Sequence, residues 1–125
     1  MLSTPSDAEL GILTVLWRCG PSTVREVHQT LAKGTGYTST LKQMQVMHEK
    51  GLLLRSERYR SHIYEAAVSK EAAQALLAGD LLHRAFEGSA KDLVLGALTA
   101  QRASAADLKE IRRMLDGFEK RRKPR

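Results

Sequence analysis

The sequence predicts a mainly α-helical chain that carries one small β-hairpin, and three observations support this fold class. Apolar residues recur at helical spacing over most of the 125 residues. A serine or threonine followed three positions later by an acidic residue marks several helix starts. One region, 52–68, is rich in β-branched and aromatic residues that roughly alternate with polar ones. With 42% hydrophobic and 27% charged residues, the chain is expected to be globular.

Two short helices are expected first, over about 7–18 and 24–32. Both begin at the spacing of a capping box: Ser6 with Glu9, and Thr23 with Glu26. Each has an apolar stripe, made of Leu10, Leu13, Leu16 and Trp17 in the first and of Val24, Val27, His28 and Leu31 in the second. Gly20-Pro21 ends the first helix, and the glycines of segment 34–36 end the second.

A third helix is expected from about Thr38 to Gly51, where the glycine allows a left-handed stop. Strands over 52–58 and 62–68 follow, joined by a turn at Tyr59-Arg60-Ser61. Two helices, a third helix and then a basic hairpin is the order of a winged helix-turn-helix. We therefore assign residues 1–68 to a winged helix-turn-helix DNA-binding domain.

Residues 69–125 are expected to form three helices, over about 70–87, 90–100 and 105–121, with a basic C-terminal tail. They carry more apolar positions than one thin layer of helices can hide, so a second copy of the chain is expected to cover them. The region is therefore interpreted as a dimerisation region. The expected interface residues are Leu77, Leu81, Leu108, Ile111, Leu115 and Phe118, the last four spaced as in a short coiled-coil seam.

The sequence contains no motif for catalysis or metal binding. None of its four histidines, His28, His48, His62 and His83, is paired with another at helical spacing, and no phosphate-cradling glycine loop occurs. We therefore expect no enzymatic activity, no metal and no cofactor. His28 and His48 are interpreted as half-buried packing residues, and the single cysteine, Cys19, as a packed small residue.

A cytoplasmic location is expected. No apolar run approaches the roughly 18 residues that span a bilayer, and the N-terminus lacks the pattern of a secretory signal. A single cysteine fits a reducing compartment. The net charge of +6 suits an anionic partner, either nucleic acid or a membrane surface, and charge alone does not choose between them.

The polar face of the third helix favours DNA. Amides, a lysine and an aliphatic group suit base edges in the major groove, and the first acidic residue of this helix is Glu49. The residues expected to read bases are Ser39, Lys42, Gln43 and Val46, while Thr38 is expected to cap the helix or hold a phosphate. Arg58, Arg60 and Ser61 of the hairpin are expected to hold the DNA backbone. The alternative is a winged-helix protein-interaction module without DNA binding, in which this face is only a solvated surface.

Segments along nearly the whole chain resemble the penicillinase-repressor family (BlaI/MecI type). They are Ala8-Glu9-Leu10, Leu16-Trp17, Thr23 to Val27, Tyr37 to Lys42, Glu49 to Leu52, His62 to Tyr64, Leu93 to Leu95, and Leu108, Ile111 and Leu115. The resemblance implies a homodimeric repressor that binds double-stranded DNA at a palindromic operator, with no membrane partner. Family members cleaved by a sensor protease have an Asn-Phe bond where this chain has Gly96-Ala97, so a regulatory protease is not supported. The cysteine-rich C-terminal motif of the copper-responsive branch is also missing.

Overall fold

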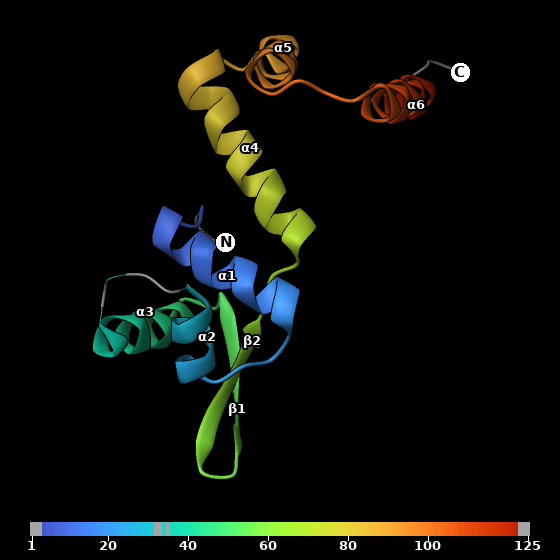
Figure 1. Cartoon of the computed structure of the whole chain (residues 1–125). Coiled ribbons are helices and arrows are strands. Elements are labelled where there is room, and N and C mark those ends of the chain that lie inside the picture. The colour runs from blue at the N-terminus through green and yellow to red at the C-terminus, as the bar shows by residue number, and fades with distance from the viewer. Residues whose placement is uncertain (1–3, 32–33, 35, 123–125) are drawn as a thin grey trace. The chain divides into compact units, whose positions relative to one another are not determined.

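The computed structural model describes residues 4–31, 34 and 36–122, and it confirms a mainly α fold with one small antiparallel sheet (Figure 1). The elements in chain order are α1 (Asp7–Cys19), α2 (Val24–Leu31), α3 (Tyr37–Glu49), β1 (Leu53–Arg58), β2 (Ser61–Ala66), α4 (Lys70–Phe86), α5 (Ala90–Ala100) and α6 (Ala105–Arg122). The order confirms a winged helix-turn-helix followed by a helical region. The predicted helix end at Ala32 and the last residues of the predicted tail, 123–125, lie outside the described residues.

The chain divides by its internal contacts into two compact units, Met1–Leu81 and Leu82–Arg125. The first unit contains the winged helix-turn-helix and most of α4, and the second contains the end of α4 with α5 and α6. The domain boundary predicted at residue 68 from the sequence stays a prediction. Within the described part of the chain, no helix is long and apolar enough to cross a membrane.

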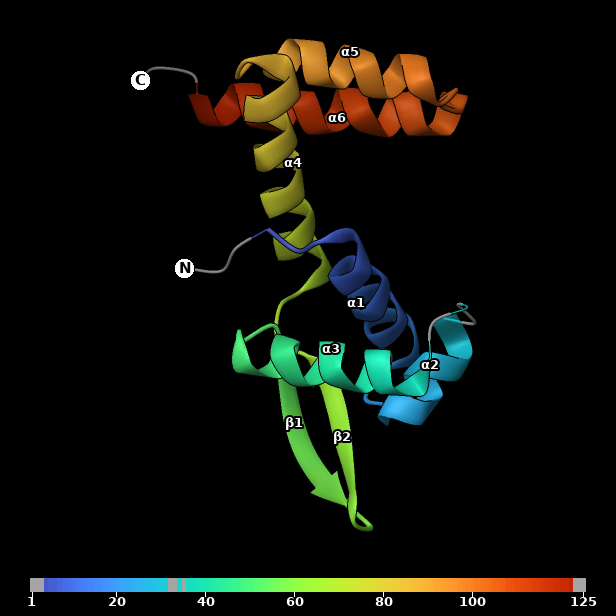
Figure 2. The ribbon, with the colours of Figure 1, turned by 90° about the vertical axis from the view of Figure 1, so that its left-hand side faces the viewer.

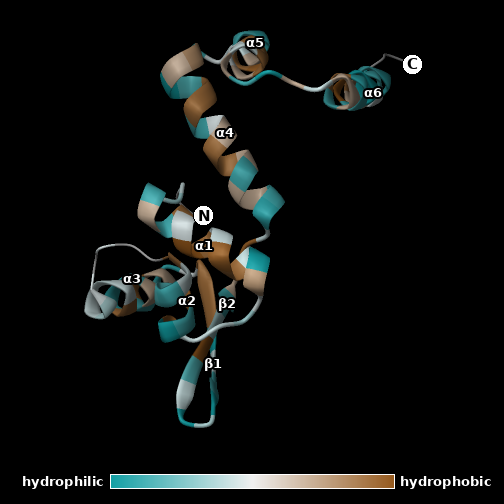
Figure 3. Cartoon of the chain, in the orientation of Figure 1, coloured by the Kyte–Doolittle hydropathy of each residue, from teal (hydrophilic) through white to brown (hydrophobic). Residues whose placement is uncertain are grey.

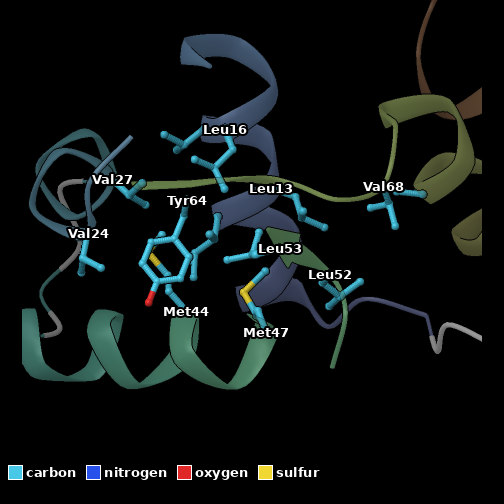
Figure 4. Close-up of a cluster of buried hydrophobic side chains, with 13 residues drawn as sticks. Leu13, Leu16, Val24, Val27, Met44, Met47, Leu52, Leu53, Tyr64 and Val68 are labelled. Atoms are coloured by element: carbon cyan, nitrogen blue, oxygen red, sulfur yellow. The ribbon is translucent and has the colours of Figure 1, made fainter. Parts of the chain in front are cut away.

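The core of the first unit is built where three helices and the hairpin meet (Figure 4). Its fully buried side chains come from every one of these elements or from the segment just before β1: Leu13, Val27, Met44, Met47, Leu52, Leu53 and Tyr64. The side chain of Trp17 adds a long-range link, because its Nε1 donates a hydrogen bond of 2.9 Å to the carbonyl oxygen of Val68. In Figure 3, parts of α1 and β1 are coloured as hydrophobic, in agreement with their contribution to this core.

The hairpin projects beyond the helices. Its base lies against α1, α2 and α3, whereas both Figure 1 and Figure 2 show its tip extending away from them. The strands pair in register from Leu53 with Ala66 to Arg58 with Ser61. The turn therefore contains two residues, Tyr59 and Arg60, rather than the predicted three. Both residues adopt left-handed backbone conformations, with φ of 52° and 66°.

The helix starts confirm the capping boxes. The Glu9 N–H donates to Ser6 Oγ at 3.2 Å while the Ser6 N–H donates to Glu9 Oε1 at 2.9 Å. Thr23 and Glu26 make the same reciprocal pair at the start of α2, at 3.1 and 2.8 Å. Gly51 has a φ of 88°, as expected of a glycine just past the end of α3.

The histidine predictions are confirmed and the cysteine prediction is wrong. His28 and His48 are half-buried. Cys19 is a free, exposed thiol at the last position of α1. The buried stripe of α1 ends at Leu16, so the side chain of Cys19 has no core to enter.

The second unit has helices but little core. No described residue of α5 or α6 is buried. The ring of Phe86 from α4 packs on Gly96 of α5, where a Cβ atom would lie 3.3 Å from it. Large apolar side chains remain exposed, among them Val94, Leu95, Met114, Leu115 and Phe118.

Candidate nucleic-acid interface

The helix α3 has one buried side and one polar, exposed side. Its buried residues are Thr40, Met44 and Met47. The residues expected to read bases lie on the other side: Ser39, Lys42 and Val46 are exposed and Gln43 is half-buried. The first turn of α3 contains no acidic residue. The structure therefore brings these four side chains together on a surface that would not repel phosphate.

Thr38 does not cap α3. The helix begins one residue earlier than predicted, and Gly36 occupies the N-cap position without any side-chain hydrogen bond. Thr38 lies inside the first turn with an exposed side chain. The prediction that it caps the helix is therefore wrong, because the glycine already supplies the extended backbone of the cap, with a φ of −74°.

The C-terminal end of α3 is fixed to α1 by an ion pair. Lys50 Nζ lies 2.8 Å from Glu9 Oε2, and Glu9 is only 3% exposed. Burial alone would raise the pKa of the Glu9 carboxyl, but the bonds from Lys50 and from the Ser6 N–H outweigh it and hold the pKa below the ordinary value. The carboxylate thus serves α1 as a cap and α3 as an anchor.

The N-terminal half of α3 is fixed to α2 by a chain of side chains. His28 Nδ1 lies 2.9 Å from Thr40 Oγ1, a hydrogen bond that satisfies the buried hydroxyl. The ring of His28 meets that of Tyr37 edge-on at 6.0 Å. The guanidinium of Arg25 lies over the same tyrosine ring, 5.2 Å from its centroid. Both ends of α3 are therefore held to the helices behind it.

The wing, defined here as β1, β2 and the Tyr59-Arg60 turn, carries its charges on two faces. Arg58 pairs with Ser61 in the strand register, and alternation places them opposite the face of Arg55 and His62. Arg58 and Arg60 are exposed and form no ion pair with any described carboxylate. His62 Nε2 lies 3.9 Å from Glu57 Oε2. The three wing residues predicted to hold the backbone are thus accessible, but Arg58 does not share a face with His62.

The residues that position α3 were only partly visible in the sequence. The capping spacing identified Glu9, but its partner Lys50 lies 41 positions away and no local pattern links them. Thr40 is buried, and its hydrogen bond joins it to His28 of another helix, 12 positions earlier. The helical stripe of α2, which contains His28, was the one available signal for this contact.

The described residues contain no cluster of three histidine, cysteine, aspartate or glutamate side chains that would hold a metal ion. The first unit instead presents a polar helix and a basic wing. This combination defines the class of protein as a winged helix-turn-helix with the surface features of a nucleic-acid-binding module.

Comparison with known proteins assigns the family. The model of the penicillinase repressor family matches residues 5–117, and the chain belongs to this family. The chain is 28% identical over 121 residues to the transcriptional regulator BlaI of Mycobacterium tuberculosis (strain CDC 1551 / Oshkosh). This alignment covers 94% of the chain and 87% of that protein. It is 23% identical over 120 residues to the penicillinase repressor of Bacillus licheniformis, covering 94% of each. The protein is accordingly a transcriptional repressor by family, and this family is regulatory rather than enzymatic.

Proposed function

We propose that this protein is a sequence-specific DNA-binding repressor that acts as a homodimer on a palindromic operator in the cytoplasm. The observation that carries the proposal is the outer face of α3, which is polar, exposed and free of acid in its first turn while both ends of the helix are anchored. A helix held in this way can enter the major groove without the entropic cost of ordering itself first.

The side chains proposed to contact DNA have two chemical roles, base reading by α3 and phosphate binding mainly by the wing. Gln43 presents an amide that suits adenine, and Lys42 presents an ammonium that suits the acceptors of guanine. Val46 and Ser39 complete the surface with a methyl contact and a hydroxyl. Arg58, Arg60 and Ser61 of the wing, together with Thr38, would contact phosphates, which orient the protein without selecting a sequence.

The dimer is supported by the apolar surfaces of α4 and α6. Leu115 and Phe118 of α6 are 52% and 57% exposed, and Leu81 of α4 is 41% exposed. Leu77, Leu108 and Ile111 are half-buried. Apolar surface of this kind is stabilised when a second copy covers it, and a two-fold dimer requires a palindromic site.

Selection of bound duplexes from a random library by the purified protein tests the proposal. The expected result is a two-fold symmetric motif, with half-sites separated by about one helical turn of DNA or slightly more. Measured affinity for the selected duplex should fall steeply with salt, because phosphate contacts release counterions. No enrichment, together with no salt-dependent binding, would instead favour a protein-interaction module.

A further inference from the structure

A pocket of about 520 Å³ lies beside α3, between the start of α2 and the wing. The residues that line it include Arg25, Tyr37, Leu41, Arg60 and His62 of the first unit. A water molecule occupies about 30 Å³ in the liquid. The pocket, called here the Arg25 pocket, therefore has room for a tetrahedral anion and several ordered waters.

The pocket gathers cationic groups without neutralising them. Arg25 and Arg60 both line it, and neither forms an ion pair with any carboxylate in the described part of the chain. Like charges in one hollow repel each other, and an anion between them removes the repulsion. Two carboxylates lie near the pocket: that of Glu26 accepts a hydrogen bond of 2.8 Å from the Thr23 N–H, and that of Glu57 lies 3.9 Å from His62 Nε2. Both residues are exposed, so their charges are screened by water.

The side chain of Arg25 is already oriented by its neighbours. Its guanidinium stacks on the ring of Tyr37, which is itself held edge-on against His28. A stacked guanidinium keeps its N–H groups free at the edges of the plane, where they can form a fork with two oxygens of a phosphate. Because the stacking restricts the side chain before any ligand arrives, less entropy is lost on binding.

Backbone donors lie next to these side chains. The capping box at Thr23 and Glu26 satisfies the N–H groups of those two residues. The N–H groups of Val24 and Arg25, in the first turn of α2, have no acceptor within the helix. Val24 and Arg25 both line the pocket, and the N-terminal end of a helix attracts anions.

A buried polar atom on the same pocket wall is a separate observation in favour of a bound ligand. Tyr64 lines the pocket and is fully buried, and its hydroxyl has no hydrogen-bond partner among the described residues. Figure 4 shows this hydroxyl directed toward α3, beside Val24 and Met44. Buried hydroxyl groups are nearly always hydrogen-bonded in proteins, so a buried donor without an acceptor lies behind this wall of the pocket.

We propose that the Arg25 pocket binds a single phosphodiester group of the DNA backbone, at the edge of the groove that α3 enters. This proposal rests on the proposed function. A helix in the major groove has a phosphate strand on either side, and the pocket borders the first turns of α3 through Tyr37 and Leu41. The phosphate held there would fix the register of Ser39 and Lys42 on the bases.

The test is a double-mutant cycle that combines removal of the Arg25 side chain with removal of the charge on one phosphate. Duplexes of the selected operator carry a single uncharged methylphosphonate, moved one position at a time, and the Kd of each is measured by fluorescence anisotropy. With the unaltered protein, several positions in each half-site are expected to weaken binding, and the position at the Arg25 pocket is expected to do so by about tenfold, as for loss of a charged hydrogen bond. In Arg25→Ala that position should become neutral, while the other sensitive positions keep their effects.

Control variants make the outcome specific. Arg18→Ala removes the same charge from an exposed site at the end of α1, and it should leave the methylphosphonate profile unchanged. Arg25→Gln repeats the test with a longer polar side chain, and thermal unfolding of each variant confirms that it is folded. If the profile of Arg25→Ala matches that of the unaltered protein, the phosphate proposal is wrong although DNA binding stands. If the unaltered protein binds no duplex, the proposed function itself fails.

A second arm separates DNA phosphate from a free anion. Inorganic phosphate is added at constant ionic strength while DNA binding is followed. The pocket needs the rest of the interface to hold a phosphodiester, so concentrations of about 10 mM should leave the Kd unchanged, because a lone anion gains only the local contacts. Competition at micromolar phosphate would overturn the proposal and identify a site for a small phosphorylated molecule.

Discussion

Glu9 shows how one side chain can serve two elements. Its carboxylate caps α1 and also binds Lys50, which directly follows α3. A buried carboxylate is unfavourable unless it is paired. The buried Glu9 side chain therefore favours the one arrangement of α1 and α3 in which its hydrogen bonds and its ion pair can form. Glu26 caps α2 in the same way but is exposed and forms no such ion pair among the described residues.

Replacement of Glu9 by glutamine should isolate the ion pair, because glutamine can still cap the helix. The free energy of unfolding of Glu9→Gln, measured by urea denaturation at neutral pH, is expected to fall by about 1–3 kcal/mol. Glu26→Gln is the matched control and should change it by less than about 0.5 kcal/mol. Equal decreases in the two variants would show that the interaction with Lys50 adds nothing.

The same pair predicts a dependence on pH. The pKa of Glu9 is lowered in the folded protein from an ordinary value of 4.5, so its stabilisation is fully present above that value. It disappears as the pH falls through the lowered pKa, where the folded carboxylate takes up a proton. The difference in unfolding free energy between the unaltered protein and Glu9→Gln should therefore shrink below pH 4.5. A difference that stays constant down to about pH 2 would contradict this assignment.

The turn residues of the wing are poorly suited to their backbone conformation. Tyr59 and Arg60 both have positive φ, which asparagine and glycine adopt far more readily. Tyr59 is 93% exposed, so packing does not explain the choice. Strained residues of this kind are retained where their side chains are needed for function.

Substitution of the turn should separate stability from binding. Tyr59→Asn with Arg60→Gly is expected to raise the free energy of unfolding by about 1–2 kcal/mol, because the left-handed strain is relieved. The same variant should bind DNA more weakly, as measured by anisotropy. Tyr59→Asn alone retains the charge and tests the ring separately. Tighter DNA binding by the double variant would show that the turn side chains do not touch DNA.

Among the elements, the helices were predicted more accurately than the hairpin turn. Capping boxes and apolar stripes are local patterns, and they identified α1 and α2 closely. The turn was predicted one residue too long, since Ser61 pairs with Arg58 instead of belonging to the loop. Nothing in Tyr59-Arg60 resembles the asparagine and glycine of a two-residue turn, so sequence preference pointed away from the observed geometry.

The exposed residues of the candidate site could be predicted from the sequence, but the interactions that orient α3 could not. The exposed residues of α3 follow from helical spacing alone. The interactions that orient the helix, Glu9 with Lys50 and His28 with Thr40, join separate elements and depend on the tertiary fold. The Arg25 pocket likewise exists only once α2 and the wing are brought together.

At the scale of an element, the wing is expected to supply affinity and not sequence preference. Removing the guanidiniums of Arg58 and Arg60 in Arg58→Ala with Arg60→Ala should weaken binding to every duplex. The slope of log K against log salt should flatten by about 0.9 for each phosphate that the variant no longer neutralises. Arg18→Ala serves as the charge control. A changed binding motif with an unchanged salt slope would show that the wing reads bases.

The whole molecule is expected to depend on a second copy of the chain. The described residues of α5 and α6 are half-buried or exposed. In the seam, Leu108 and Ile111 are half-buried, and Leu115 and Phe118 are exposed. A lone layer of this kind buries too little apolar surface to be stable. Dimerisation would also align two recognition helices on one operator.

Light scattering of Leu115→Asp tests the dimer. A carboxylate in an apolar seam would be left without a partner, so the measured mass is expected to fall from two chains to one. Ala106→Asp, at an exposed position of α6 outside the seam, should retain the mass of two chains. An unchanged mass in Leu115→Asp would place the interface between copies elsewhere.

A measurement of base discrimination is the most direct test of the proposed role of α3. The Kd of Gln43→Ala is measured on the selected operator and on operators altered at each base pair, with Gln29→Ala on α2 as the matched control. The expected result is that discrimination at one base position in each half-site falls by about 1–3 kcal/mol while the other positions are unaffected. A uniform weakening over all sequences, equal to that of removing a phosphate-binding side chain, would show that α3 does not read bases.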